Sequence, residues 1–117
     1  MVKVERVEFD EKISPLSPLE EKIMEFLWKH GPSHVALIAE EIDASLSSVA
    51  ATLDRLVKNG LVERKQEKID GRRKFVFYPV VSRNELERRF VENVLDRLVE
   101  NFGEVVVEYF HRKGIRK

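Results

Sequence analysis

Apolar residues recur along the chain at two different spacings, and these spacings predict where helices and strands form. The 3.6-residue repeat of amphipathic helices covers residues 19–28, 35–42, 46–57 and 84–110. Two β-prone stretches, residues 61–68 and 72–80, lie between the third and the last of these segments. The pattern therefore predicts three short helices, a pair of strands and a long C-terminal helical region that Gly103 interrupts.

Capping residues support these boundaries. Ser17, Pro18 and Glu20 form the start signal of the first helix, in which Ser is the N-cap and Glu reaches back to close a capping box. Further N-caps are predicted at Ser33 for the second helix, at Ser45 for the third, and at Ser82 or Asn84 for the long helix. Asn59-Gly60 is the predicted end of the third helix, with Gly in the left-handed conformation.

The two strands are predicted to form a hairpin. Asp70-Gly71 separates them, and Asp-Gly between β-prone runs is typical of a two-residue turn. Such a turn sets Lys68 opposite Arg73 and Glu67 opposite Lys74.

The chain is expected to divide into three regions. Val2, Val4, Val7 and Phe9 alternate with charged residues, which predicts a short strand or an extended arm. The predicted regions are an N-terminal arm at 1–16, a domain of three helices and a hairpin at 17–81, and a helical region with a basic tail at 82–117.

Three helices followed by a hairpin form the order of a winged helix-turn-helix domain, so the predicted class is mainly α with a small β component (α+β). A helix that enters the major groove of DNA needs one buried face and one free face. With Val49, Leu53 and Leu56 buried, the residues predicted to point outward are Ser47, Ser48, Ala51, Thr52, Arg55 and Lys58. Short side chains at the start of the helix allow close approach, and Arg55 is suited to guanine or phosphate.

The hairpin, or wing, carries the second predicted DNA contact. Its cations are Arg64, Lys65, Lys68, Arg72, Arg73 and Lys74. Cations in this place bind phosphates and release counterions, although Lys and Arg on exposed strands also prevent edge pairing. The alternative is a winged helix that contacts another protein in a larger assembly, for which exposed aromatic residues would be expected instead. Phe75 and Phe77 alternate onto one face, which the helices are expected to cover.

Charge is distributed unevenly, although Lys plus Arg and Asp plus Glu both number 21 in the 117 residues. Residues 1–42 hold 5 basic and 9 acidic residues, a balance of −4. Residues 43–78 hold 8 and 5, which gives +3, and residues 79–117 hold 8 and 7, which gives +1. The electropositive third of the chain is therefore the one that contains the third helix and the wing.

The sequence offers little for catalysis. It contains no cysteine, which excludes disulfides, thiolate metal sites and cysteine nucleophiles. His30, His34 and His111 lack metal-ligand spacing, and no glycine-rich phosphate loop is present. We therefore expect no enzyme activity, no catalytic or metal site and no cofactor. Without a signal peptide or a membrane-length apolar run, the expected location is cytoplasmic.

The C-terminal region carries more apolar surface than one small domain covers. The residues predicted to form a homodimer interface are Leu86, Phe90, Val94, Leu95, Leu98, Phe102, Val106, Tyr109 and Phe110. The alternative is that this region folds back onto its own winged domain and leaves a monomer.

The run from Ser45 to Arg64 resembles the segment from recognition helix to wing in prokaryotic winged-helix repressors. Over residues 16–110 the chain is similar to the penicillinase-repressor family, which also shows the Ile-Met-x-x-Leu-Trp pattern in its first helix. The resemblance implies a homodimeric repressor on a two-fold symmetric operator in double-stranded DNA, dimerised through C-terminal helices.

The chain departs from the family pattern in its C-terminal region. Glu100-Asn101 replaces a glycine pair, and Tyr109-Phe110 stands where β-lactam-responsive members carry a cleavable Asn-Phe. The cysteine cluster of the copper-responsive members is absent. The resemblance therefore implies no particular small-molecule inducer.

Overall fold

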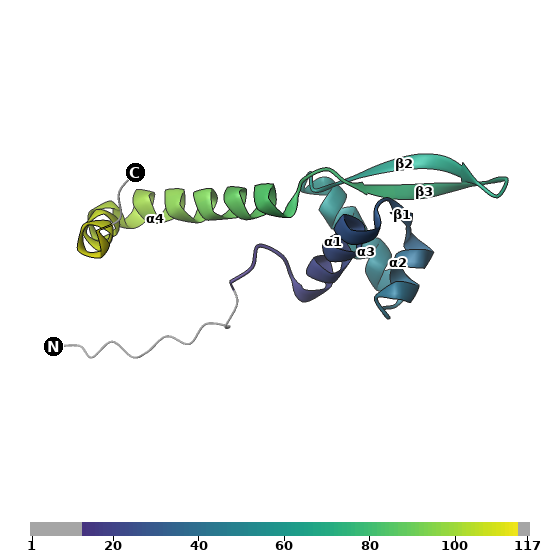
Figure 1. Ribbon diagram of the computed structural model, residues 1–117, viewed down its shortest axis with the longest axis horizontal. Helices are drawn as coiled ribbons and strands as arrows, with labels where there is room; N and C mark the ends of the chain where they lie inside the picture. The colour runs from purple at the N-terminus through teal and green to yellow at the C-terminus, as the bar shows by residue number, and fades with distance from the viewer. Residues whose placement is uncertain (1–12, 115–117) are drawn as a thin grey trace. The chain divides into compact units, whose positions relative to one another are not determined.

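The computed structural model describes residues 13–114, so the arm predicted at residues 2–9 lies outside the described part (Figure 1). The elements in order are α1 (Pro18–His30), β1 (Ser33–His34), α2 (Val35–Glu41), α3 (Leu46–Lys58), β2 (Val62–Ile69), β3 (Arg72–Pro79) and α4 (Arg83–Lys113). The chain forms two compact units, one that ends at Val80 and one that begins at Val81.

Helix α1 begins as its sequence predicts. The Ser17 hydroxyl accepts a hydrogen bond from the Glu20 amide at 3.2 Å, and the Glu20 carboxylate accepts one from the Ser17 amide at 2.8 Å. Both partners of the capping box are thus present. The helix ends at Gly31, whose φ of 89° lies in the region that favours glycine.

Helix α2 is capped by His34, whereas the sequence predicts Ser33 as its N-cap. The Nδ1 atom of His34 accepts a hydrogen bond from the Leu37 amide at 3.3 Å. Ser33 lies in β1, where its hydroxyl donates to the Gly31 carbonyl at 3.1 Å. Strand β1 pairs with β3 and holds Ser33 one residue too early to cap the helix.

Helix α3 lies at the centre of the winged unit. Ser45 caps it as predicted, and Val49, Leu53 and Leu56 are completely buried. Leu46, at the start of the apolar repeat predicted over residues 46–57, is 55% exposed, because it sits in the first turn before the helix enters the core. The helix packs against α1, α2 and β2, and Gly60 beyond its end has a φ of 77°.

The hairpin has the predicted register. Lys68 pairs with Arg73 and Glu67 with Lys74. The two turn residues, Asp70 and Gly71, have positive φ angles of 50° and 79°, as a type I′ turn requires. The sheet order is β1-β3-β2, and β1 covers only Val76 and Phe77 of β3.

The core of the winged unit combines all of these elements. Its fully buried members outside α3 include Ile23, Met24 and Leu27 of α1 and Ile38 of α2. The strand residues Val62, Val76 and Phe77 are also buried. Since three helices and the sheet all contribute side chains, the positions of α3 and the wing depend on one shared core.

Helix α4 forms the C-terminal unit. Ser82, one of the two predicted caps, accepts a hydrogen bond from the Glu85 amide at 3.1 Å. The backbone of Phe102 is non-helical (φ −140°, ψ 35°), so the helix bends one residue before the predicted interruption at Gly103. In the first turns, hydrogen bonds from Arg88 and Arg89 lower the pKa of the Glu85 carboxyl below its usual range.

The buried stripe of α3 makes a testable stability prediction. Leu53→Ala should lower the free energy of unfolding by about 2–5 kcal/mol, because it removes a fully buried side chain from a closed core. Leu46→Ala is the matched control in the same helix and should change this free energy by less than about 0.5 kcal/mol. Urea denaturation followed by circular dichroism measures both, and equal effects would contradict the assigned orientation of α3.

Candidate nucleic-acid interface

Helix α3 presents a continuous polar face. Ser47, Ser48, Ala51, Arg55 and Lys58 are all exposed, as the sequence predicts. The first turn is ordered by serines, because the Ser45 hydroxyl accepts from the Ser48 amide at 3.2 Å and donates to the Ser48 hydroxyl at 2.8 Å. The face therefore carries short, uncharged side chains where the helix begins and basic side chains where it ends.

Thr52 does not belong to this face, contrary to the sequence prediction. Its side chain is 2% exposed, and its hydroxyl accepts a hydrogen bond from Nη2 of Arg55 at 3.1 Å. Position 52 falls on the same side of the helix as Val49, Leu53 and Leu56, so the buried face is wider than predicted. Thr52 therefore positions the Arg55 guanidinium and does not reach outward itself.

Asp54 is an exposed residue of α3 that the sequence analysis left out. Its carboxylate lies 3.8 Å from Nη1 of Arg64 on β2, and both side chains are largely exposed. The signal was present, because positions 47, 51, 54 and 58 repeat at the spacing of one helix face. The free face of α3 thus contains one acid among its polar and basic side chains.

The wing cations divide into two groups. At the root, the Arg64 guanidinium lies 4.5 Å from the Phe75 ring centre, and Nζ of Lys65 lies 5.0 Å from the Tyr78 ring centre and 3.5 Å from Glu63. Toward the turn, the remaining predicted cations are exposed; they are Lys68, Arg72, Arg73 and Lys74. The root cations thus lie against aromatic rings although they are exposed, while the other cations lie nearer the tip.

The two phenylalanines of β3 differ in exposure, although they alternate onto one face as predicted. Phe77 is 5% exposed, whereas Phe75 is 45% exposed. Phe77 lies at the root of the wing, next to β1, and Phe75 lies beyond the reach of that strand. The expectation that the helices cover both rings is therefore wrong for Phe75, whose ring carries the Arg64 guanidinium instead.

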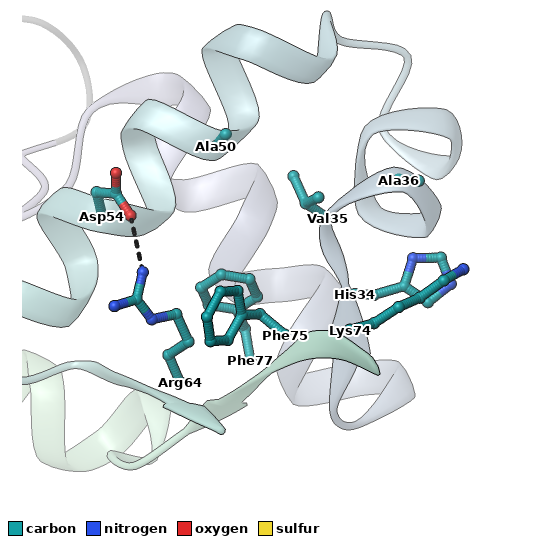
Figure 2. Close-up of a pocket in the computed structure, with 9 residues that line it drawn as sticks. All are labelled: His34, Val35, Ala36, Ala50, Asp54, Arg64, Lys74, Phe75 and Phe77. Carbon is teal, nitrogen blue, oxygen red and sulfur yellow. Dashed lines mark ion pairs between the residues drawn. The ribbon is translucent and has the colours of Figure 1, made fainter. Parts of the chain in front are cut away.

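A cavity of about 370 Å³ lies between α2, α3 and the root of the wing. Figure 2 shows its lining, with the Phe75 and Phe77 rings on the strand side and Ala50 and Val35 facing them from the helices. The other lining residues are His34, Ala36, Asp54, Arg64 and Lys74. The lining is mainly apolar, and its charged groups stand toward two ends of the cavity.

The predicted dimerisation residues of α4 fall into three groups. Leu86 is buried within the single chain, so it is not free to contact a second copy. Half-buried are Phe90, Leu95, Val106 and Phe110, and exposed are Val94, Leu98, Phe102 and Tyr109. The structure adds four exposed valines that the prediction omitted, namely Val91, Val99, Val105 and Val107.

Two histidines have structural partners. His30 stacks on Phe26 with 4.5 Å between ring centres, and His34 caps α2.

Across residues 13–114, no group of three or more His, Cys, Asp or Glu side chains could hold a metal ion. In the same residues, no helix has both the length and the apolar character needed to cross a membrane.

The sequence profile of the penicillinase repressor family matches residues 16–117. The chain belongs to the penicillinase repressor family. This confirms the resemblance noted between residues 16 and 110 and extends it to the end of the chain. The family is named for a penicillinase repressor, and the curated relative below is named as a transcriptional regulator.

A curated relative is the uncharacterized HTH-type transcriptional regulator YfiV of Bacillus subtilis (strain 168), 43% identical over 51 residues. The match covers 44% of this chain and 32% of that protein, so the chain spans about a third of the relative's length.

Solved structures share the fold. A possible transcriptional regulator from Methanosarcina mazei Go1 has a TM-score of 0.61 at 14% identity, with 80% of this chain and 79% of that chain covered. A MarR family protein from Bacillus stearothermophilus has a TM-score of 0.54 at 21% identity, with 86% and 73% covered. Stf76 from the Sulfolobus islandicus plasmid-virus pSSVx has a TM-score of 0.51 at 25% identity, with 59% and 88% covered. This penicillinase repressor family chain is thus a winged helix-turn-helix protein, mainly helical with a small antiparallel sheet.

Proposed function

We propose that this penicillinase repressor family member binds double-stranded DNA as a homodimer and represses transcription from a two-fold symmetric operator. The observation that carries the proposal is the joint placement of two surfaces on the winged unit. One is the exposed polar face of α3, and the other is the group of exposed cations around the wing tip. Family membership supports the regulatory role.

In this proposal α3 enters the major groove. Ser47, Ser48 and Ala51 are short, so the start of the helix approaches the base edges closely. Arg55 follows one turn later and reaches guanine O6 and N7, a common specific contact of arginine. Its guanidinium is already oriented by the hydrogen bond to Thr52, which reduces the side-chain entropy lost on binding.

The wing supplies contacts that do not depend on sequence. Lys68, Arg72 and Arg73 flank the turn and are exposed, so they are free to approach phosphates beside the groove that α3 occupies. Each phosphate neutralised releases counterions, which makes the affinity fall with salt. The rival function, contact with another protein, would use Phe75, but the Arg64 guanidinium lies over this ring.

The proposed dimer uses α4 and the dimerisation region at 82–117. Exposed apolar side chains continue along most of this helix, from Val91 to Tyr109. A chain that leaves so many valine, leucine and phenylalanine side chains exposed gains stability when a second copy covers them. A two-fold axis through this region would present two α3 helices to successive turns of DNA, about 34 Å apart.

DNA binding should depend steeply on salt. We expect binding to random-sequence duplexes at about 50 mM salt, with a log–log slope that falls by about one unit in Arg72→Ala or Arg73→Ala. Lys22→Ala, which removes an exposed cation of α1 outside the interface, should leave the slope unchanged. Fluorescence anisotropy across a salt series measures the slope. A slope near zero in the unmodified chain would disprove the proposal and favour a protein partner.

Arg55 should govern sequence preference. On the best duplex selected from a random library, Arg55→Ala should weaken binding by about 1–3 kcal/mol and remove discrimination at one base position. Thr52→Val should produce a smaller loss of affinity and of discrimination at the same base position, because it keeps the Arg55 guanidinium but removes the hydrogen bond that orients it. Equal weakening on all duplexes would instead identify Arg55 as a phosphate contact.

The intact chain should be a dimer. Light scattering at micromolar concentration should give twice the chain mass, whereas a chain that ends at Arg83 should be monomeric. Leu98→Glu in the full-length chain should shift the equilibrium toward monomer, since Leu98 is exposed and its replacement leaves the core of one chain intact. Glu100→Gln is the control on the same helix. A dimer that survives both truncation and Leu98→Glu would place the interface elsewhere.

A further inference from the structure

The cavity between α2, α3 and the wing root has the size of a small-molecule site. Its volume of about 370 Å³ falls within the range of roughly 300–1,000 Å³ that is usual for such sites. Two small side chains leave this space open, because Ala36 on α2 and Ala50 on α3 line it where larger residues would fill it (Figure 2). The rings of Phe75 and Phe77 complete an apolar surface suited to a flat hydrophobic group.

The polar groups around this surface are mainly donors. Arg64 and Lys74 are cations, and Asp54 is the one acid in the lining, so the balance is two positive charges against one negative charge. None of the ion pairs within residues 13–114 involves Lys74. His34 adds a further donor, because its Nδ1 accepts from the Leu37 amide and the proton of the neutral ring is then on Nε2.

We infer that this cavity binds a small aromatic carboxylate, and that binding weakens the attachment of α3 to DNA. The apolar lining takes the ring, and Arg64 takes the carboxylate at its end of the cavity, while Lys74 and His34 stand toward the other end. An arginine fork binds a carboxylate with two parallel hydrogen bonds, a geometry that the 3.8 Å contact with Asp54 does not supply. A neutral aromatic compound of the same shape lacks this interaction.

The link to DNA runs through Asp54 and rests on the proposed function. Asp54 lies on α3 beside Ala51 and Arg55, and its charge is offset by Arg64. A ligand carboxylate that takes the guanidinium leaves Asp54 unpaired next to the DNA-facing side chains and adds a negative charge of its own. Both changes repel phosphates, so ligand and DNA should each lower the affinity of the chain for the other by the same factor.

The ligand site is tested first without DNA. Benzoate is titrated into the full chain while the NMR signals of the Ala36 and Ala50 methyl groups and of the Phe75 ring are followed. Saturable shifts should appear at millimolar benzoate, and benzamide should bind at least tenfold more weakly. Arg64→Gln should weaken benzoate binding at least tenfold. No shifts at these signals up to ~10 mM, or equal binding of benzamide, would overturn the inference.

A filled cavity provides the second test. Ala36→Phe places a ring in the space and should abolish benzoate binding, whereas Leu37→Phe, on the same helix but outside the lining, should retain it. Thermal unfolding shows whether each variant folds. If Ala36→Phe does not fold, the benzoate titration of Arg64→Gln still tests the ligand site, since that change lies on an exposed part of β2. Benzoate binding that persists in a folded Ala36→Phe chain would place the ligand elsewhere.

The coupling is measured with the duplex selected from the random library. Saturating benzoate should lower the affinity of the unmodified chain for this duplex threefold to tenfold and should have no effect on Ala36→Phe. Benzoate that binds without changing the DNA affinity would overturn the coupling. Weaker DNA binding by folded Ala36→Phe in the absence of benzoate would show that the cavity receives DNA itself, which would also overturn it. If no duplex binds, the proposed function fails, while the NMR titration still tests the ligand site.

Discussion

The burial of one stripe of α3 determines how the rest of the winged unit is arranged. Val49, Leu53 and Leu56 are completely enclosed by α1, α2 and the sheet. Rotating the helix about its axis would expose these side chains to water, at a cost of about 1.5–3 kcal/mol for each. The opposite face is thereby held outward, and its residues are available to contact a partner.

Electrostatic interactions at the wing root contribute less to stability than this burial does. The pair of Asp54 and Arg64 is exposed on both sides, so it adds less than about 1 kcal/mol to stability. A pair this weak is readily exchanged for another partner. The same holds for Lys65 and Glu63 nearby. The fold therefore tolerates a rearrangement of charges at the wing root, where a buried ion pair would resist it.

Local signals in the sequence were sufficient for most of the fold. The capping box at Ser17, the cap at Ser45 and the Asp70-Gly71 turn each depend on residues within a few positions, and all form as predicted. Strand β1 could not be predicted, because its two residues become a strand only by pairing with β3, more than forty positions away.

The candidate interface residues also divide into those that local helical spacing placed correctly and those that depend on tertiary packing. The outward direction of Ser47, Ser48, Ala51, Arg55 and Lys58 followed from helical spacing alone. Thr52 was misplaced because only Val49, Leu53 and Leu56 were taken as the buried set, whereas the buried face is wider and includes Thr52, whose hydroxyl accepts a hydrogen bond from Arg55. Phe75 was misplaced because the extent of the helical layer over the wing depends on tertiary packing that a strand pattern does not contain.

The short length of β1 has a mechanical consequence. It pairs only with Val76 and Phe77 of β3, so among residues 13–114 the hairpin beyond them is a ribbon of two strands (Figure 1). Two-stranded ribbons are twisted more strongly than wider sheets. In the proposed function, the root of the wing is fixed by the core, and the twist of the outer ribbon sets the angle at which its cations approach the duplex.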